Sequence, residues 1–188
     1  MRLENSFEVP ASEAAAWDLL MDVPRVIPCM PGAKLDETVD DSSWKATMQV
    51  KLGPIALSFA TDVKREEFDE AAHRAKLSAR ARETKGRGAA QATIESSLTA
   101  MDGTTRVEIV TELSLSGAVA QYGRGIVQDV SSQLVNSFAE CLKTQLAGSG
   151  EEAEAAVEAQ AKPVSGLSLG LRAFARAIGR LFRFGRKG

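Results

Sequence analysis

The sequence offers few groups for acid–base or metal chemistry. Its one histidine, His73, could serve as a general base, but it stands beside a predicted turn, where an ordinary surface histidine is the favoured interpretation. Two pairs of adjacent acids, at positions 40–41 and 66–67, also fall in polar turns, which favours solvated carboxylates. The segment 85–88, Lys-Gly-Arg-Gly, lacks the context of a phosphate-binding loop and predicts a hairpin turn. We therefore predict no catalytic residue and no metal site.

The chain has two cysteines, Cys29 and Cys141. Their separation matches neither a metal-binding nor a redox-active spacing. Because a free buried cysteine behaves as a small apolar side chain, the sequence predicts two ordinary buried thiols and no disulfide framework.

The C-terminal segment carries the strongest functional pattern in the chain. Apolar residues recur there at steps of three and four with arginines between them, so a helix would have one apolar and one basic face. This pattern is typical of a helix that lies in a membrane interface. Docking on a protein partner is the alternative, whereas nucleic-acid binding would gain nothing from apolar anchors. The predicted membrane-binding residues are Leu171, Arg172, Phe174, Arg176, Ile178, Arg180, Leu181, Phe182 and Arg183.

Charge divides the chain into three parts. Residues 148–162 hold four glutamates and one lysine, and from Pro163 onward there are six basic residues and no acidic ones. We predict a ligand-binding domain over residues 1–147, a flexible acidic linker over 148–165 and a basic amphipathic tail over 166–188. The total of 23 basic and 25 acidic residues gives no overall signature of nucleic-acid binding.

The N-terminal residues lack the apolar run of a signal peptide, and no segment approaches the roughly 20 apolar residues that span a bilayer. We therefore expect a cytoplasmic protein. With the tail as anchor, it would be peripheral on the inner face of the cytoplasmic membrane.

Alternation of apolar and polar residues predicts six strands joined mostly by short turns. Residues 11–20 form a short helix capped by Ser12, and three prolines and a glycine make residues 22–32 an irregular connection. Consecutive strands with short turns imply an antiparallel meander. The strands cover the N-terminal residues through Val9 and residues 44–51, 55–63, 75–81, 90–100 and 107–115.

One long helical pattern, Gly117 to Leu146, follows the strands. Its apolar residues recur on one face, which a sheet must cover, and this predicts an α+β helix-grip domain with a curved antiparallel sheet wrapped around a long C-terminal helix. Three glycines weaken the start of the helix. Either the helix begins near Gly125 after a loop, or the glycines form a flexible gate where Tyr122 meets a ligand.

Small residues, mostly alanine, dominate the predicted inner face of the sheet. They leave either a closely packed alanine core or an internal apolar cavity, and a large empty cavity is costly enough that an occupant is expected. The candidate cavity residues, from strand alternation and the helix face, are Trp44, Met48, Phe59, Leu77, Ile94, Tyr122, Ile126 and Val130.

Three segments, VPRVIPCMPGAKL, KLGPIALSF and YGRGIVQDVSSQLVNSFAECL, together resemble the carbon monoxide dehydrogenase CoxG family, within the START-like, Bet v 1-like (SRPBCC) superfamily. The resemblance covers about residues 1–147. It implies a helix-grip fold with a cavity for an apolar ligand. It also implies association with a molybdenum-containing CO dehydrogenase or related hydroxylase, which the family is thought to recruit to the cytoplasmic membrane.

Together, the resemblance and the tail suggest a protein that binds a quinone, ubiquinone or menaquinone, or a similar isoprenoid lipid without covalent attachment. It would bridge the dehydrogenase to an anionic membrane and its quinone pool without being an enzyme. A recruitment adaptor with no pocket ligand is one alternative. The other is a cyclase- or dehydratase-type enzyme, which would need a catalytic group among Thr61, Ser96, Thr111 and Tyr122.

Overall fold

The structure, a computed structural model, describes residues 1–52 and 55–148 of the chain. The predicted linker and tail lie outside these residues, apart from Gly148. In chain order the elements are β1 (Arg2–Val9), α1 (Glu13–Met21), α2 (Val23–Val26), the 3-10 helix η1 (Ile27–Cys29), β2 (Ala33–Asp40), β3 (Ser43–Leu52), β4 (Ile55–Asp69), β5 (Arg74–Glu83), β6 (Gly88–Met101), β7 (Thr104–Gly117), the 3-10 helix η2 (Ala118–Tyr122) and α3 (Gly123–Leu146).

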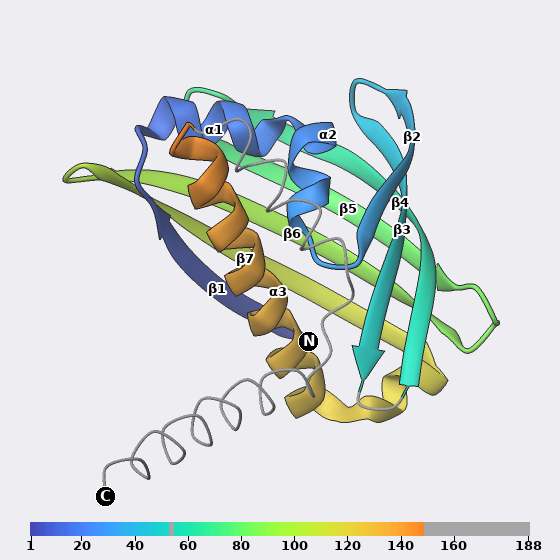
Figure 1. Cartoon of the computed structure of the whole chain (residues 1–188). Coiled ribbons are helices and arrows are strands. Elements are labelled where there is room, and N and C mark those ends of the chain that lie inside the picture. The colour runs from blue at the N-terminus through green and yellow to red at the C-terminus, as the bar shows by residue number, and fades with distance from the viewer. Residues whose placement is uncertain (53–54, 149–188) are drawn as a thin grey trace, which may run out of the picture.

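The seven strands form one antiparallel sheet in the order β1-β7-β6-β5-β4-β3-β2. The chain therefore meanders from β2 to β7, and β1 pairs with β7 at the far edge. Figure 1 shows the sheet curving around the helices, with α1 and α2 across one end and α3 along the side of β1 and β7. This arrangement confirms the predicted α+β helix-grip fold.

The strand β2 was not predicted from the sequence. It follows the proline-rich connection, and six of its eight residues, Lys34 and Asp36 to Asp40, are exposed. Leu35 is partly buried and Val39 is 50% exposed. Because β2 is an edge strand, it lacks the alternation that marks a strand with one buried face.

The short helices follow the expected local chemistry. Ser12 caps α1, since its hydroxyl accepts a hydrogen bond from the Ala15 backbone N–H at 3.3 Å. Asp22 caps α2 in the same way through the Arg25 N–H. The connection between α1 and β2 holds only the single turns α2 and η1, as the prolines predict.

The long helix begins later than Gly117, the first residue of the predicted helical pattern. Strand β7 continues to Gly117, η2 follows, and α3 begins at Gly123. Gly117 and Gly123 have φ values of +69° and +75°, which disfavour other residues. A Cβ on Gly117 would also lie 2.8 Å from the Gly88 Cα of the neighbouring strand. The glycines thus mark a chain reversal before the helix, and the flexible gate stays a prediction.

Buried side chains form two separate clusters. The closed-end cluster joins α1, α2 and the last third of α3 to one end of the sheet, and it includes Val9, Trp17, Leu19, Val107, Phe138 and Leu142. The hairpin-end cluster lies at the other end, where Leu57, Phe59 and Val119 are buried together with the partly buried Met48, Val50 and Tyr122. The part of the sheet that carries most of the small residues lies between the two clusters.

None of the helices in the described part of the chain is long and apolar enough to cross a membrane.

Candidate ligand-binding face

The strand register defines the residues that share the inner face, because directly paired residues in an antiparallel sheet point to the same side. One row runs Val63, Ala79, Ala92 and Leu113 across β4 to β7. The rows on either side lie between the two clusters or border them. We call these three the middle rows: Leu77, Ile94 and Thr111; Val63, Ala79, Ala92 and Leu113; Thr61, Ala81, Ala90 and Leu115.

Every residue of the middle rows is partly exposed, and none is buried. The facing part of α3 behaves alike: Val127, Val130 and Leu134 are partly exposed, and Ile126 is 46% exposed. The same helix has 1% exposure at Leu142 in its last third. These residues of the middle rows and of α3 therefore keep accessible surface that neighbouring side chains do not cover, unlike residues of a packed interior.

The structure places the eight predicted cavity residues in different parts of the domain. Leu77 and Ile94 lie side by side in the middle rows, and Val130 is partly exposed on α3. Trp44, 4% exposed, extends the central row onto β3. Ile126 is the most exposed of the eight. The remaining three, Met48, Phe59 and Tyr122, belong to the hairpin-end cluster.

One cation lies at the edge of this face. Arg65 pairs with Leu77 and therefore points to the inner side of β4. Its guanidinium lies 4.9 Å from the ring centroid of Phe68 and 5.7 Å from that of Trp44, and it donates to the Asp41 carbonyl at 2.7 Å. Sequence reasoning missed Arg65, although the alternation through Thr61 and Val63 extends to it.

An ion pair between Glu83 and Arg87 lies at the hairpin end. Glu83 pairs with Phe59 on the inner face, and its fully buried carboxylate accepts a hydrogen bond from the Arg87 guanidinium at 2.8 Å. It also accepts from the Lys85 and Arg87 backbone N–H groups. The Arg87 hydrogen bond is the main cause that lowers the pKa of Glu83 to about 2, against a desolvation penalty of burial. The pair fixes the 84–87 turn, which confirms the predicted hairpin.

One polar atom of the middle rows lacks a partner. The Thr61 hydroxyl oxygen is buried and has no hydrogen-bond partner among the described residues. Thr61 lies between Ala46 and Ala81 in its row, so its neighbours on either side are small. A buried hydroxyl without a partner carries a free-energy cost that a bound acceptor would remove.

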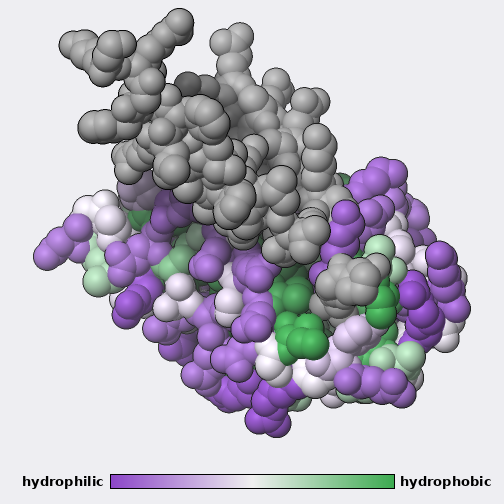
Figure 2. All heavy atoms as spheres, turned by 60° about the horizontal axis from the view of Figure 1, so that its bottom comes forward, coloured by the Kyte–Doolittle hydropathy of each residue, from purple (hydrophilic) through white to green (hydrophobic). Residues whose placement is uncertain are grey.

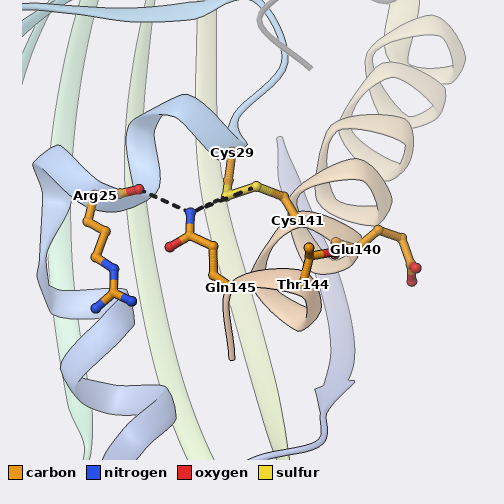
Figure 3. Close-up of a disulfide and its surroundings, with 6 residues drawn as sticks. All are labelled: Arg25, Cys29, Glu140, Cys141, Thr144 and Gln145. Carbon is orange, nitrogen blue, oxygen red and sulfur yellow. Dashed lines mark hydrogen bonds between the residues drawn. A yellow bond between two sulfur atoms is a disulfide. The ribbon is translucent and has the colours of Figure 1, made fainter. Parts of the chain in front are cut away.

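The two cysteines are bonded, which corrects the prediction of free thiols. Cys29 on η1 and Cys141 on α3 form a disulfide across 112 residues, and both are fully buried. Figure 3 shows Gln145 beside it, donating to the Cys29 sulfur at 3.1 Å and to the Arg25 carbonyl at 3.4 Å. The prediction was wrong because the pairing depends on the chain path through the proline-rich connection, which spacing alone does not reveal.

His73 has a structural environment. It occupies the turn between β4 and β5 with φ of +46°, and its ring packs on Trp17 with centroids 5.4 Å apart. Its Nδ1 lies 3.3 Å from a Glu13 carboxylate oxygen. His73 is therefore held against α1, outside the middle rows. Within residues 1–52 and 55–148, no group of three or more His, Cys, Asp or Glu side chains is placed to hold a metal ion.

Two surface hollows lie away from the middle rows. One of about 270 Å³ lies between β1 and α3 and is lined mainly by polar residues, including Asn5, Gln128 and Ser131. The other, of about 250 Å³, lies at the hairpin end and includes Lys51, Leu57 and Arg87. Neither contains any of the eight predicted cavity residues.

Comparison with known proteins identifies the family. The model of the carbon monoxide dehydrogenase G-subunit family (CoxG) matches residues 6–147. The chain belongs to the CoxG family. The match spans the whole described domain except its first five residues and Gly148, and the family takes its name from an accessory subunit of carbon monoxide dehydrogenase.

Solved structures place this CoxG chain among START-like folds. A conserved protein from Geobacillus kaustophilus is 20% identical with a TM-score of 0.70, covering 78% of this chain and 95% of that one. A START superfamily protein from Mycobacterium smegmatis is 14% identical with a TM-score of 0.54, covering 78% and 97%. The Zhui aromatase/cyclase from Streptomyces sp. R1128 is 12% identical with a TM-score of 0.56, covering 78% and 93%. These identities establish the fold alone, and no curated protein sequence matches the chain significantly.

Proposed function

We propose that this CoxG chain carries an apolar ligand, a quinone such as ubiquinone or menaquinone or a similar isoprenoid lipid. It delivers the ligand between a membrane and a molybdenum-containing CO dehydrogenase-type enzyme. The observation behind this proposal is the partly exposed set of middle rows between two buried clusters. Apolar surface inside a fold is unfavourable in water, so a ligand that covers it stabilises the protein.

The residues present fit a quinone. Alanines at 79, 81, 90 and 92 leave room for a flat ring or an isoprenoid chain against the sheet. The unpartnered Thr61 hydroxyl supplies a hydrogen-bond donor, and a quinone carbonyl supplies the acceptor that it lacks. The ligand is held by non-covalent contacts, and the protein has no covalently bound cofactor in this proposal.

We assign no catalytic step to the chain. A cyclase would require an acid or base beside the ligand, but His73 packs on α1 and Glu83 is engaged by Arg87. Of the polar groups predicted for the cavity, Thr61, Thr111 and Ser96 are neutral hydroxyls on the inner face, and Ser96 donates to the Ala75 carbonyl. Aliphatic hydroxyls without an adjacent base are poor catalysts.

The location rests on the family and on the sequence of the tail. The accessory-subunit name supports association with the dehydrogenase, and the basic amphipathic segment 166–188 supports a peripheral position at the inner face of the cytoplasmic membrane. The segment 148–165, predicted as a linker, joins the domain to this anchor. Burial of the disulfide keeps it away from soluble reductants.

Lipid extraction of the full-length protein followed by mass spectrometry tests the carrier function. We expect a quinone or isoprenoid lipid to co-purify with the protein at a molar ratio that approaches one lipid molecule per chain. Thr61→Val, which keeps the side-chain shape and removes the hydroxyl, is expected to weaken quinone binding several-fold and leave binding of a plain isoprenoid unchanged. A protein free of lipid that also fails to take up added quinone would reject the carrier proposal.

A recruitment adaptor without a ligand is the second candidate, favoured by the observation that neither described hollow contains the predicted cavity residues. An adaptor needs the tail and a docking surface but no free inner face. Deletion of residues 166–188 would then abolish both membrane localisation and activity, whereas Ala92→Leu would leave both intact. Loss of activity in Ala92→Leu would favour the carrier.

A further inference from the structure

The hairpin end of the domain exposes large apolar side chains. Ile55, at the start of β4, is 37% exposed, and Ile126, in the first turn of α3, is 46% exposed. Both belong to the same end, since Leu57 and Tyr122, two and four residues away, meet in the hairpin-end cluster. Figure 2 looks toward this end and shows hydrophobic residues gathered in a patch bordered by hydrophilic ones.

Basic side chains surround the same end without carboxylate partners. Lys51, Lys85 and Arg124 are exposed, and none takes part in an ion pair among the described residues. Lys45 and Lys76, nearer the other ends of β3 and β5, differ, because each lies within 3.1 Å of a glutamate oxygen. The nearby carboxylate of Glu83 is turned inward and occupied by Arg87.

We propose that this hairpin end, with Ile55 and Ile126 at its centre and Lys51, Lys85 and Arg124 around it, is a docking surface for an anionic lipid bilayer. The apolar side chains enter the interface and the cations meet lipid phosphates. The inference rests on the proposed function, because a carrier must bring its ligand face to the membrane, but it assigns the contact to the domain itself rather than to the tail.

The chemistry of the surface favours a bilayer over another macromolecule. Cations around exposed apolar residues match the layered chemistry of a membrane interface, with phosphates outside and hydrocarbon within. A nucleic acid would use the cations but not Ile55 or Ile126. The hollow of about 250 Å³ is lined by Lys51, Lys85, Arg87 and Glu83, and since Arg87 pairs with the Glu83 carboxylate, one lipid phosphate would meet the two lysines. Leu57 and Val50 line the same hollow and give it an apolar side.

Environment-sensitive fluorophores on the full chain test the orientation. One fluorophore is attached to Ile55→Cys, where the native side chain is 37% exposed. The other is attached to Met101→Cys at the β6–β7 turn, where the native side chain is 46% exposed and lies away from the hairpin-end cluster. Both native cysteines are in the disulfide, so each variant carries one reactive thiol. With vesicles of phosphatidylglycerol and phosphatidylcholine, we expect the emission at position 55 to shift to the blue and that at position 101 to stay unchanged.

Charge variants give an independent measure. Lys51→Gln with Lys85→Gln should lower partitioning of the full chain onto these vesicles by about 10- to 25-fold at low salt, since each cation near an anionic leaflet contributes about fivefold. The matched control is Arg25→Gln with Arg74→Gln, which removes the same charge beside the closed-end cluster and is expected to change partitioning less than twofold.

The outcomes separate this inference from the proposed function. Co-sedimentation with vesicles but no shift at position 55, or equal losses from the two charge pairs, would overturn the docking surface and leave the tail as anchor. A shift produced by the dehydrogenase without vesicles would overturn it in favour of a protein interface. Absence of vesicle binding by the full chain would reject both membrane contacts, while lipid extraction would still test ligand carriage.

Discussion

The closed end and the middle rows belong to the same sheet and the same helix, yet they are built differently. At the closed end, Phe138, Cys141 and Leu142 of α3 are 7%, 0% and 1% exposed against α1, β1 and the disulfide partner. One to four turns earlier, the apolar side chains of α3 and the alanines opposite them all remain partly exposed.

The difference indicates that the two parts of α3 have different roles, one in stability and one in leaving space for a ligand. A disulfide and large apolar side chains fix the last third of α3, so the rest of the helix can stand over the sheet without packing tightly against it. The small residues of the middle rows then leave room for a ligand over the inner face of the sheet. Stability is therefore concentrated at one end, and capacity for a ligand lies between the two clusters.

The largest effect is expected from the disulfide that ties the closed end. Replacing both cysteines by serine should lower the free energy of unfolding by about 4–5 kcal/mol, because the bond closes a loop of over a hundred residues in the unfolded chain. Denaturant unfolding with and without reductant measures the loss. The double variant should be insensitive to reductant, and a wild-type protein equally insensitive would contradict the contribution of the bond.

Shortening a leucine side chain at two positions of α3 compares the closed end with the region over the middle rows. Leu142→Ala should cost about 2–5 kcal/mol because it empties a buried site, whereas Leu134→Ala should cost about 1 kcal/mol or less in the ligand-free protein. The same chemistry at two positions of one helix makes the pair self-controlled. Equal losses in urea titrations would show that the helix is packed along its whole length.

Replacing an alanine by the larger leucine in each region gives the reverse comparison. Ala139→Leu, at a site with 3% exposure, should destabilise the protein by about 1–3 kcal/mol through overpacking. Ala92→Leu should cost under about 1 kcal/mol because the middle row has room, but it should displace the ligand. Gln91→Leu on the exposed outer face is the control that keeps the ligand. Thermal unfolding and lipid content of the three variants test the contrast.

The smallest effect is expected from the ion pair between Glu83 and Arg87 at the hairpin end. The folded pKa of Glu83, about 2, lies below its ordinary value of 4.5, so between these pH values the unfolded chain binds more protons. Glu83 therefore contributes stability above pH 4.5 that is lost as the pH falls toward 2. Glu83→Gln should flatten the dependence of the melting temperature on pH in that window, and an unchanged slope would contradict the shift.

Much of the architecture could be predicted because burial on one face leaves a period of two in strands and of three to four in helices. Alternation placed Leu77, Ala79 and Ala92 on the inner face, as the register shows. It failed for β2, an edge strand whose exposed residues leave no period. The eight cavity residues were predicted from strand alternation and from the helix face. The structure brings Leu77 and Ile94 together but places Met48, Phe59 and Tyr122 in a neighbouring cluster.

Features that depend on the chain path in three dimensions could not be predicted. The Cys29–Cys141 bond requires that η1 return beside the end of α3. Arg65 and Glu83 each continue a predicted alternation by one step, but both lie beyond the ends of the predicted strands. Their roles arise from partners on other segments, Trp44 and Arg87.

The two tryptophans offer the most direct test of the ligand space, since Trp17 lies in the closed-end cluster and Trp44 in the central inner-face row. The full chain, Trp17→Phe and Trp44→Phe are titrated with a short-chain ubiquinone while tryptophan emission is followed. We predict saturable quenching that is strong for Trp44 in the Trp17→Phe variant and weak for Trp17 in the Trp44→Phe variant. Quenching that rises linearly without saturation, or that is equal for the two tryptophans, would contradict a ligand space over the middle rows.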